Sequence, residues 1–413
     1  MKRSFSVSSK PEIIESMSQK ILFVSGSVSN RIQCALFDKY HLSTGFAIQK
    51  YYKLLEDGFA RNGAEIDALS IVPIPKVLAP FRVKCFPKEK ERNVNFRYVP
   101  YFRFAPFYHP FMLLYVMWRV FVWSIRHRRD GIVLCDVLIP CLCIGAAWGG
   151  ALAGIPRVAW VTDMPGMSAS GSNHYEEMGL LGKLQMRCIR RFSAYVFSTE
   201  ACSTILNPNH NPYIIMEGLV DPEIKPHKEE FQNTTRDILY CGGLEEAYGL
   251  GYLCEAFMRL EEPDLRLIIY GDGPFKGKIQ EYAKADSRID FPGVAQNATI
   301  VEAERRATIL VNPRFSGAEY TLYTFPSKNI EYMVSGTPML TTKLPGIPAD
   351  YYPFIFTFDD ETVDGYTLTL RRILRYSAEE LRAFGASAQQ FVLKNKNAEV
   401  QVKRLMKLMN NTR

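Results

Sequence analysis

The sequence is poor in the residues and motifs that mark several common kinds of active site. It holds only six histidines, and its nine cysteines are irregularly spaced, without a Cys-x-x-Cys pair. This pattern argues against a disulfide framework or a zinc site and indicates reduced, buried thiols in a cytosolic protein. An Asp-x-Asp pair for a metal–diphosphate complex is missing, as are P-loop, Ser-His-Asp and His-Glu-x-x-His patterns. We therefore expect neither a bound metal nor a bound cofactor.

Long hydrophobic runs are scarce as well. The first 20 residues are polar and serine-rich, so we expect no cleavable signal peptide and a flexible tail over 1–19. The longest apolar run lies within 106–125; it has about 15 residues and is broken by Arg119, whereas a transmembrane helix needs roughly 20. We favour a buried helix for this segment, then an in-plane membrane-docking helix, and a true span last. Two tryptophans and the basic cluster 126–129 favour docking over a span.

Positive charge is concentrated in the first half of the chain. Residues 1–215 hold 26 Lys and Arg against 15 Asp and Glu, whereas 216–413 hold 24 against 28. The net charge is thus +11 in the first half and −4 in the second, which together make +7. This asymmetry predicts an anionic partner for one half only. An anionic membrane surface, or a lipid-diphosphate acceptor on it, fits better than nucleic acid, for which we find no recognition motif. We expect a cytoplasmic protein that can attach peripherally to the inner face of the membrane.

Strand-like apolar runs alternate with helical stretches along both halves of the chain. This rhythm predicts an α/β fold with two Rossmann-like, doubly wound parallel sheets. Because ligands bind at the carboxyl ends of such strands, two facing sheets would share a cleft between their loops. The stretch 378–408 reads as helical, with a break near 395–397. Behind the tail we predict an N-terminal domain over 20–217, a linker over 218–235, a C-terminal domain over 236–390 and, over 391–413, a C-terminal helix that returns to the N-terminal domain.

The segment 321–338, TLYTFPSKNIEYMVSGTP, has the features of an anion-binding helix entry. Pro326 and Ser327 resemble a helix start, at which Ser327 would cap the first turn. Free backbone N–H groups there bind anions, and Lys328 adds a positive charge beside them. Glu331 follows about one turn later, where its carboxylate would accept hydrogen bonds from two ribose hydroxyls. A capped helix with an incidental lysine and glutamate is the alternative for this pattern alone.

Several motifs make the C-terminal half resemble the donor domain of glycosyltransferase family 4, whose members have the GT-B fold. The motifs are the glycine loop Gly242-Gly243-Leu244, GDGP at 271–274, RIDFPG at 288–293, VNPR at 311–314 and FPSKNIEYMVSGTP at 325–338. A bacterial branch that acts on exopolysaccharide or capsular polysaccharide is the most similar, through YGL at 248–250, TKLPGIPADYY at 342–352, LLEDGFARNGAEIDALS at 54–70, VTDMP at 161–165 and IIMEGLVD at 214–221. The resemblance covers about 20–408 and is dense only in the C-terminal half.

The resemblance implies a function for the whole chain. It implies transfer of a sugar, with retention of anomeric configuration and without a metal, from a uridine or guanosine diphosphate donor to a hydroxyl of a lipid-linked glycan. The N-terminal domain would bind the acceptor and the C-terminal domain the nucleotide sugar. The residues that it assigns to donor binding are Gly242, Gly243, Gly271, Gly273, Arg314, Tyr323, Phe325, Pro326, Ser327, Lys328 and Glu331. The leaving phosphate would take the acceptor proton, so electrostatic stabilisation of that phosphate would be the largest catalytic effect.

One departure from the family pattern concerns its two glutamates, which stand eight positions apart. Glu331 matches the second, which binds the donor ribose. Tyr323 stands at the position of the first, so the usual carboxylate to the donor sugar is missing. Glu319 is a nearby carboxylate that would substitute from a longer loop, and an exposed loop residue without a role is the alternative.

A second departure removes two positive charges from the diphosphate site. The family often has an arginine just after the glycine of the first loop and a lysine before the later glycine. Here those positions hold Gly243 and Tyr248. We predict that Lys328, with Arg314 as a weaker second, supplies the missing charge.

The N-terminal half offers fewer candidates. Asp163 lies at a strand end and would contact the acceptor or the sugar, or only cap a turn. His174 is the best histidine candidate for the cleft, and Gly26, in the loop 25–30, would border the acceptor site. Lys328, Glu319 and Asp163 are thus the predicted catalytic residues.

Two rival functions stay open. A catalytically silent relative that binds sugar nucleotides or scaffolds an assembly is compatible with the departures at Tyr323, Gly243 and Tyr248. A sugar-nucleotide epimerase of the same fold would need carboxylate and histidine side chains around the sugar. The scarcity of histidine in the N-terminal half argues against it.

Overall fold

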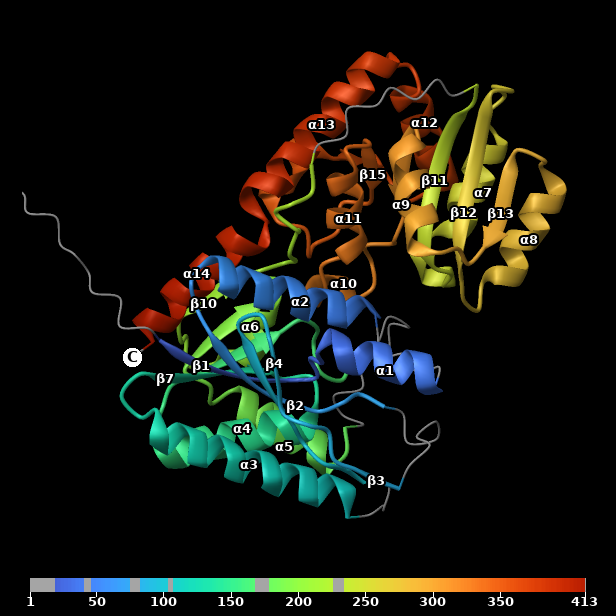
Figure 1. Ribbon diagram of the computed structural model, residues 1–413. Coiled ribbons are helices and arrows are strands. Elements are labelled where there is room, and N and C mark those ends of the chain that lie inside the picture. Colours follow the sequence, from blue (N-terminus) through green and yellow to red (C-terminus); the bar gives the residue numbers. More distant parts are fainter. Residues whose placement is uncertain are drawn as a thin grey trace, which may run out of the picture.

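The structure is a computed structural model that describes residues 19–40, 46–74, 82–102, 107–167, 178–225 and 234–412. Within these ranges the chain forms two α/β domains, one above the other in Figure 1, with a long helix running down one side. The predicted tail lies outside the described residues except for Gln19, and so does most of the second half of the predicted linker.

The first domain is built on an eight-stranded sheet with the order β10-β9-β8-β7-β1-β2-β5-β4. All neighbouring strands are parallel except β4, which runs antiparallel to β5 at the edge. Ile21 of β1 pairs in register with Ile66 of β2. The strands are β1 (Lys20–Ser25), β2 (Ile66–Ser70), β4 (Glu89–Glu91), β5 (Val94–Tyr98), β7 (Gly131–Asp136), β8 (Arg157–Val161), β9 (Ala194–Phe197) and β10 (Tyr213–Ile215). A separate pair is formed by β3 (Val83–Lys84) and β6 (Tyr101–Phe102).

Helices cover both faces of this sheet, because side chains of successive strand residues point to opposite faces and both sets are apolar. Ile21 and Phe23 pack with α1, α2 and α14, whereas Leu22 and Val24 pack with α3 to α6. The helices are α1 (Asn30–Tyr40), α2 (Phe46–Arg61), α3 (Tyr108–Arg126), α4 (Pro140–Ala153), α5 (Leu180–Ile189), α6 (Ala201–Leu206) and α14 (Ala398–Asn411).

The second domain is built on a six-stranded, fully parallel sheet with the order β13-β12-β11-β14-β15-β16. Its strands are β11 (Arg236–Gly243), β12 (Leu265–Asp272), β13 (Ile289–Gly293), β14 (Ile309–Asn312), β15 (Met339–Thr341) and β16 (Phe356–Thr357). One face packs against α7 (Leu250–Met258), α8 (Lys276–Ala285) and α12 (Val363–Ile373). The other face packs against α9 (Asn297–Arg306), α11 (Ser327–Ser335) and α13 (Ala378–Asn395). The prediction of two doubly wound parallel sheets is confirmed.

The chain crosses between the domains twice at one place. Val220 donates its backbone N–H to the carbonyl of Lys396 (3.0 Å) and accepts from the N–H of Ala398 (2.9 Å). The Lys396 ammonium is buried there and bridges Glu217 (2.9 Å) and Asp350 (3.2 Å). The helical stretch breaks between α13 and α14, as the sequence predicts, and α14 lies against α2 of the first domain. Figure 1 shows α13 on the upper domain and α14 on the lower one.

Candidate active site between the two domains

The predicted glycine loops meet at the carboxyl edge of the second sheet. Gly242 and Gly243 end β11, and Gly271 lies in β12 directly beside Gly242. Gly271 has φ 149°, and a Cβ there would stand 1.9 Å from the carbonyl oxygen of Gly242. Gly273 follows in the next turn. Only glycine fits so close an approach, so these residues let the two strand exits pack against each other.

A cavity of about 370 Å³ opens beside these strand exits, between the two domains. The first domain contributes the segment that follows β8, and the second contributes η1 (Glu246–Tyr248), the loop after β14 and the entry of α11. The lining residues are Asp163, Met164, Met167, Tyr248, Arg314, Tyr320, Thr324, Phe325, Pro326 and Ser327. Five of the predicted site residues, from segments far apart in the sequence, therefore face one space.

The entry of α11 corrects one prediction. The helix begins at Ser327 itself, so Pro326 occupies the N-cap position and no side chain caps the helix. Ser327 stands one position too late for its hydroxyl to act as the predicted cap. Among the described residues, the first-turn N–H groups of this nine-residue helix have no side-chain acceptor, and that of Asn329 donates to the carbonyl of Pro326 (2.9 Å). Pro326 and Ser327 line the cavity, so the N–H groups of Ser327 and Lys328 at this helix end can bind an anion.

Arg314 is part of the cavity wall that the second domain contributes. Its guanidinium lies 4.2 Å from the ring centroid of Tyr248 and 5.8 Å from that of Tyr320. The Nε atom of Arg314 and the hydroxyl of Tyr320 are buried, and neither has a hydrogen-bond partner within the described part of the chain. Buried polar groups without partners are rare in proteins, and at a cavity wall they are available to form hydrogen bonds with a ligand or with water.

Asp163 lies on the opposite wall, just after β8. Its side chain is exposed to the cavity, which residues of both domains line. Burial raises the pKa of Asp163, and the nearby positive charge of Arg314 opposes that rise. A carboxylate from one domain thus faces a guanidinium from the other across the cavity.

Lys328 and Glu331 lie farther along α11, outside the cavity lining. Glu331 forms ion pairs with Lys328 (3.4 Å) and with Lys50 of α2 in the first domain (3.5 Å). Glu304 of α9 is buried nearby, and burial raises its pKa to about 7, with Lys328 lowering and Glu331 raising the pKa. This part of the site is a charged cluster that extends from the second domain to α2.

The predicted residue Glu319 precedes the short helix α10 (Tyr320–Tyr323), and Tyr323 is its last residue. Glu319 is exposed, precedes α10 and does not line the cavity. The α10 backbone instead contacts the first domain: the hydroxyl of Thr199 donates to the carbonyl of Leu322 (2.9 Å) and that of Ser198 to the carbonyl of Tyr323 (3.4 Å). The structure therefore gives α10 a role in joining the domains.

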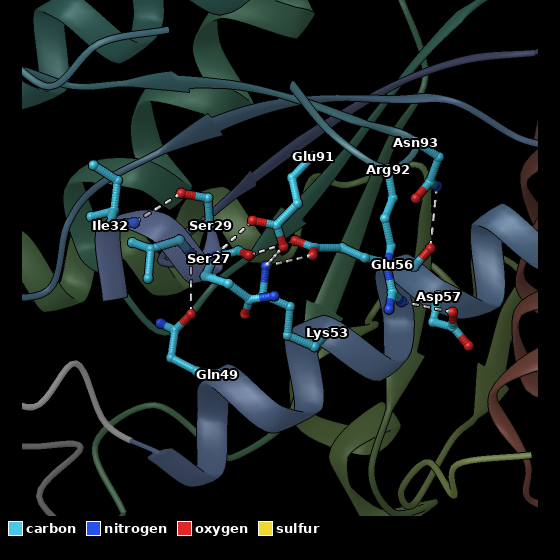
Figure 2. Close-up of polar contacts among 12 residues, drawn as sticks. Ser27, Ser29, Ile32, Gln49, Lys53, Glu56, Asp57, Glu91, Arg92 and Asn93 are labelled. Atoms are coloured by element: carbon cyan, nitrogen blue, oxygen red, sulfur yellow. Dashed lines mark hydrogen bonds and ion pairs between the residues drawn. The ribbon is translucent and has the colours of Figure 1, made fainter. Parts of the chain in front are cut away.

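The loop after β1 contains Gly26, the predicted acceptor-side residue, and Figure 2 shows its neighbours. The Gln49 side chain donates to the carbonyl of Gly26 (2.7 Å) and accepts from the N–H of Val28 (3.0 Å). Ser27 donates to Glu56, a buried carboxylate that also contacts Lys53 at 3.4 Å. The polar groups of this loop are thus paired within the first domain. The other acceptor-side prediction, His174, lies outside the described residues.

Four functional candidates of this region were not among the predicted site residues. Tyr320 is a tyrosine outside any recognised motif, so the sequence gives no sign that it lines the site. Lys50 and Glu304 reach Glu331 from other helices, and only the tertiary structure brings them there. Tyr248 was noticed only as a missing lysine.

The helix α3 forms an outer surface of the first domain, on the side away from α2 in Figure 1. Met112, Val116 and Val120 are buried against α4, as the favoured interpretation predicts. The opposite side leaves large apolar side chains exposed, with Leu114 at 57% and Trp118 at 53%. Within the described ranges, no helix is long and apolar enough to cross a membrane.

The arrangement of the cysteine, histidine and acidic side chains bears on metal and redox chemistry. Seven of the nine cysteines are buried, Cys34 and Cys85 are exposed, and none of the nine, all of which lie in described ranges, forms a disulfide. Among the residues that the structure describes, no three His, Cys, Asp or Glu side chains gather into a group that could hold a metal ion.

Comparison with known proteins identifies the second domain. Residues 235–374 match the family described as "Glycosyl transferases group 1". These residues hold all six strands of the second sheet, the glycine loops and the entry of α11. The chain thus carries a group 1 glycosyltransferase domain and is a glycosyltransferase. No curated protein matches the sequence.

Solved structures share the architecture of the whole chain at low sequence identity. The lipopolysaccharide outer core galactosyltransferase WaaB, in its apo form, is 14% identical with a TM-score of 0.60, covering 96% of this chain and 100% of that one. HepE of Anabaena in complex with UDP is 12% identical with a TM-score of 0.62, covering 94% and 100%. Sucrose-phosphate synthase from Thermosynechococcus elongatus is 12% identical with a TM-score of 0.62, covering 96% and 100%. These likenesses confirm the fold, which is consistent with GT-B.

Proposed function

We propose that the protein transfers a sugar from a uridine or guanosine diphosphate donor to a glycan hydroxyl, with retention of anomeric configuration and without a metal ion. The observation that carries this proposal is the cavity in which Asp163, Arg314 and the uncapped entry of α11 converge. Cationic and N–H groups on one wall suit a diphosphate, and a carboxylate on the other suits a hydroxyl group. HepE, which has the same architecture, was solved with UDP and with UDP-glucose.

The proposed reaction moves no proton through a strong general base. The bond between the anomeric carbon and the phosphate oxygen breaks, and its electron pair stays on the nucleoside diphosphate. The acceptor oxygen forms the new bond to the same face of the anomeric carbon, and its proton passes to the leaving phosphate. Positive charge near that phosphate then supplies the main stabilisation of the transition state. Glu331, one helical turn beyond the cavity, binds the donor ribose in this proposal.

A donor screen tests the proposal directly. Thermal shift with UDP, GDP, ADP and dTDP identifies the nucleotide, because a ligand that binds only the folded state raises Tm, and at equal concentration the tightest ligand raises it most. Release of the same nucleoside diphosphate from its sugar conjugate, on addition of a membrane extract that supplies the acceptor, then measures transfer. Binding without release would favour the catalytically silent alternative, and interconversion of the free sugar nucleotide would favour the epimerase. Turnover that falls on addition of EDTA and returns with Mg²⁺ would contradict metal-independent transfer.

The acceptor in this proposal is lipid-linked, of the exopolysaccharide or capsular type, and the outer side of α3 docks on an anionic membrane surface. Exposed Leu114 and Trp118 would enter the headgroup region, with Arg119 and the exposed basic residues after α3 beside the lipid phosphates. The net charge of +11 in residues 1–215 supports the same orientation.

Vesicle flotation tests the docking surface. We expect the protein to float with vesicles containing phosphatidylglycerol and not with pure phosphatidylcholine vesicles. The double variant Leu114→Ser, Trp118→Ser should lower the bound fraction about tenfold, since each buried apolar side chain contributes about 1–2 kcal/mol to membrane binding. Leu368→Ser, which changes an equally exposed leucine on α12 of the other domain, is the matched control. Equal binding of all three proteins would contradict the proposal.

A further inference from the structure

The two positions that lack the expected positive charge lie against each other in the structure. The ring of Tyr248 stands 3.6 Å from the place that a Cβ on Gly243 would occupy. The guanidinium of Arg314 lies on the same ring, 4.2 Å from its centroid. A positive charge is therefore present within one side chain's length of both positions, although it comes from the loop after β14.

The surroundings of Arg314 hold this charge in place. A Cβ on Gly249, which has φ 71°, would stand 2.1 Å from the carbonyl oxygen of Pro313, so the turn of Tyr248 and the loop of Arg314 touch through backbone atoms. The hydroxyl of Tyr366 donates to that same carbonyl (2.8 Å). The N–H of Ser316 donates to the Glu361 carboxylate (2.9 Å). The Tyr248 ring, which we call the platform, and the Arg314 guanidinium are thus held next to each other independently of any ligand.

Among the residues that the structure describes, Arg314 keeps a hydrogen-bond donor free for a ligand. Its buried Nε has no partner within the described ranges, and the carboxylate that it faces, Asp163, belongs to the other domain. Lys328 differs on each point, because it already forms an ion pair with Glu331 and lies outside the cavity lining. A preorganised donor that needs no rearrangement stabilises developing charge better than a group that must leave an existing partner.

We propose that Arg314, held on the ring of Tyr248, is the cation that binds the donor diphosphate and neutralises the leaving nucleoside diphosphate. Tyr248 is then a positioning residue that replaces the lysine of related enzymes by supporting an arginine from another loop. When the bond between sugar and phosphate breaks, the diphosphate gains one negative charge, and the guanidinium donates hydrogen bonds to the oxygen that receives the electron pair. This inference rests on the proposed function, and it reverses the predicted ranking of Lys328 above Arg314.

Nucleotide binding and turnover of a matched set of variants test the inference. With the nucleotide found in the donor screen, Arg314→Ala should weaken binding of the nucleoside diphosphate more than tenfold and leave binding of the nucleoside within twofold. It should also lower kcat about 100-fold or more, the range seen when one oxyanion donor is removed. Lys328→Ala should lower kcat less than Arg314→Ala does. Arg382→Ala, an exposed arginine on α13, is the control.

Variants of the platform separate positioning from folding. Tyr248→Phe keeps the ring and should retain most of the activity that Tyr248→Leu loses, with both proteins unfolding at similar temperatures. Tyr248→Lys introduced into Arg314→Ala should restore part of kcat, because it returns a cation to the same place.

The outcomes distinguish this inference from the proposed function. A wild-type protein that neither binds a nucleoside diphosphate nor releases one would overturn both. If the wild type turns over normally and Arg314→Ala has the same kcat and diphosphate affinity, the role of Arg314 alone would be overturned. The same holds if Arg314→Ala loses affinity for the nucleoside as much as for the nucleoside diphosphate. Equal losses in Tyr248→Phe and Tyr248→Leu would overturn the role of the ring.

Discussion

Two loops that each follow a central parallel strand differ in where their polar groups find partners. The loop 26–29 after β1 is paired within its own domain, through Gln49 and Glu56. The segment 313–327 after β14 keeps buried donors without partners in the described structure, namely Arg314 Nε and the Tyr320 hydroxyl. Because an unpaired buried polar group costs about 1–3 kcal/mol, the first loop is built for stability and the second for a ligand.

The largest effect that this comparison predicts is on donor binding, and it lies at Glu331, next to the segment 313–327. If its carboxylate accepts two ribose hydroxyls, Glu331→Ala removes two charge-assisted hydrogen bonds, together about 3 kcal/mol. We expect the KM for the donor, or the Kd for its nucleoside, to rise about 100-fold. Glu302→Ala, an exposed glutamate on α9, is the control. A donor KM within threefold of the wild-type value would remove Glu331 from the ribose site.

A pH effect comes next in size and contrasts two buried glutamates. Burial raises the pKa of both, but Glu56 accepts a hydrogen bond from Ser27, whereas the charged groups acting on Glu304 are Lys328, Glu331, Lys50 and Arg305. An acid whose folded-state pKa lies above its unfolded value stabilises the fold at low pH. That stability is lost as the pH rises from about 4.5, through the folded-state pKa of about 7.

The measurement is the difference between wild type and Glu304→Gln. Between pH 5 and 8 the wild type should lose about 2.5 kcal/mol of unfolding free energy relative to the variant, which cannot ionise at this position. Urea denaturation at each pH supplies the free energies, and Glu302→Gln should follow the wild type. Parallel pH curves for all three proteins would show that Glu304 ionises normally.

Much of the fold could be predicted because buried parallel strands leave a strong signal. Runs such as 21–26 and 266–274 have a continuous apolar core followed by glycine, at Gly26 and at Gly271, and both are strands at the predicted places. The edge strand β4 and its neighbour β5 were missed. Every residue of β4 is charged and none is fully buried, so hydrophobicity carries no sign of it. Its position depends on pairing with β5, which is a tertiary effect.

The candidate site could be predicted only where one segment carries it. The entry of α11 was found from the order of Pro326, Ser327 and Lys328, although the helix begins one residue earlier than a serine cap at Ser327 requires. The stack of Arg314 on Tyr248 joins residues 66 positions apart, and the ion pair of Lys50 with Glu331 joins two domains. Neither contact has a local sequence signal, because each depends on how separate loops are packed.

Loss of the hydrogen bonds that hold the loop 26–29 should lower the stability of the protein and leave donor binding unchanged. Gln49→Ala would leave the carbonyl of Gly26 and the N–H of Val28 buried without their partner. We expect a loss of about 2 kcal/mol in unfolding free energy, measured by urea denaturation. The donor KM should stay within twofold. A large rise in KM at unchanged stability would show that this loop also belongs to the binding site.

The smallest effect should come from a group that is both paired and exposed. Lys50 reaches Glu331 across the domain boundary at 3.5 Å, but its side chain is 63% exposed and Glu331 is 42% exposed. Exposed ion pairs contribute about 0–1 kcal/mol, and salt screens them. Lys50→Ala should therefore change the donor KM less than fivefold, and 0.5 M NaCl should abolish the difference. A tenfold or salt-resistant change would mean that Lys50 contacts the donor itself, so that α2 also forms part of the ligand site.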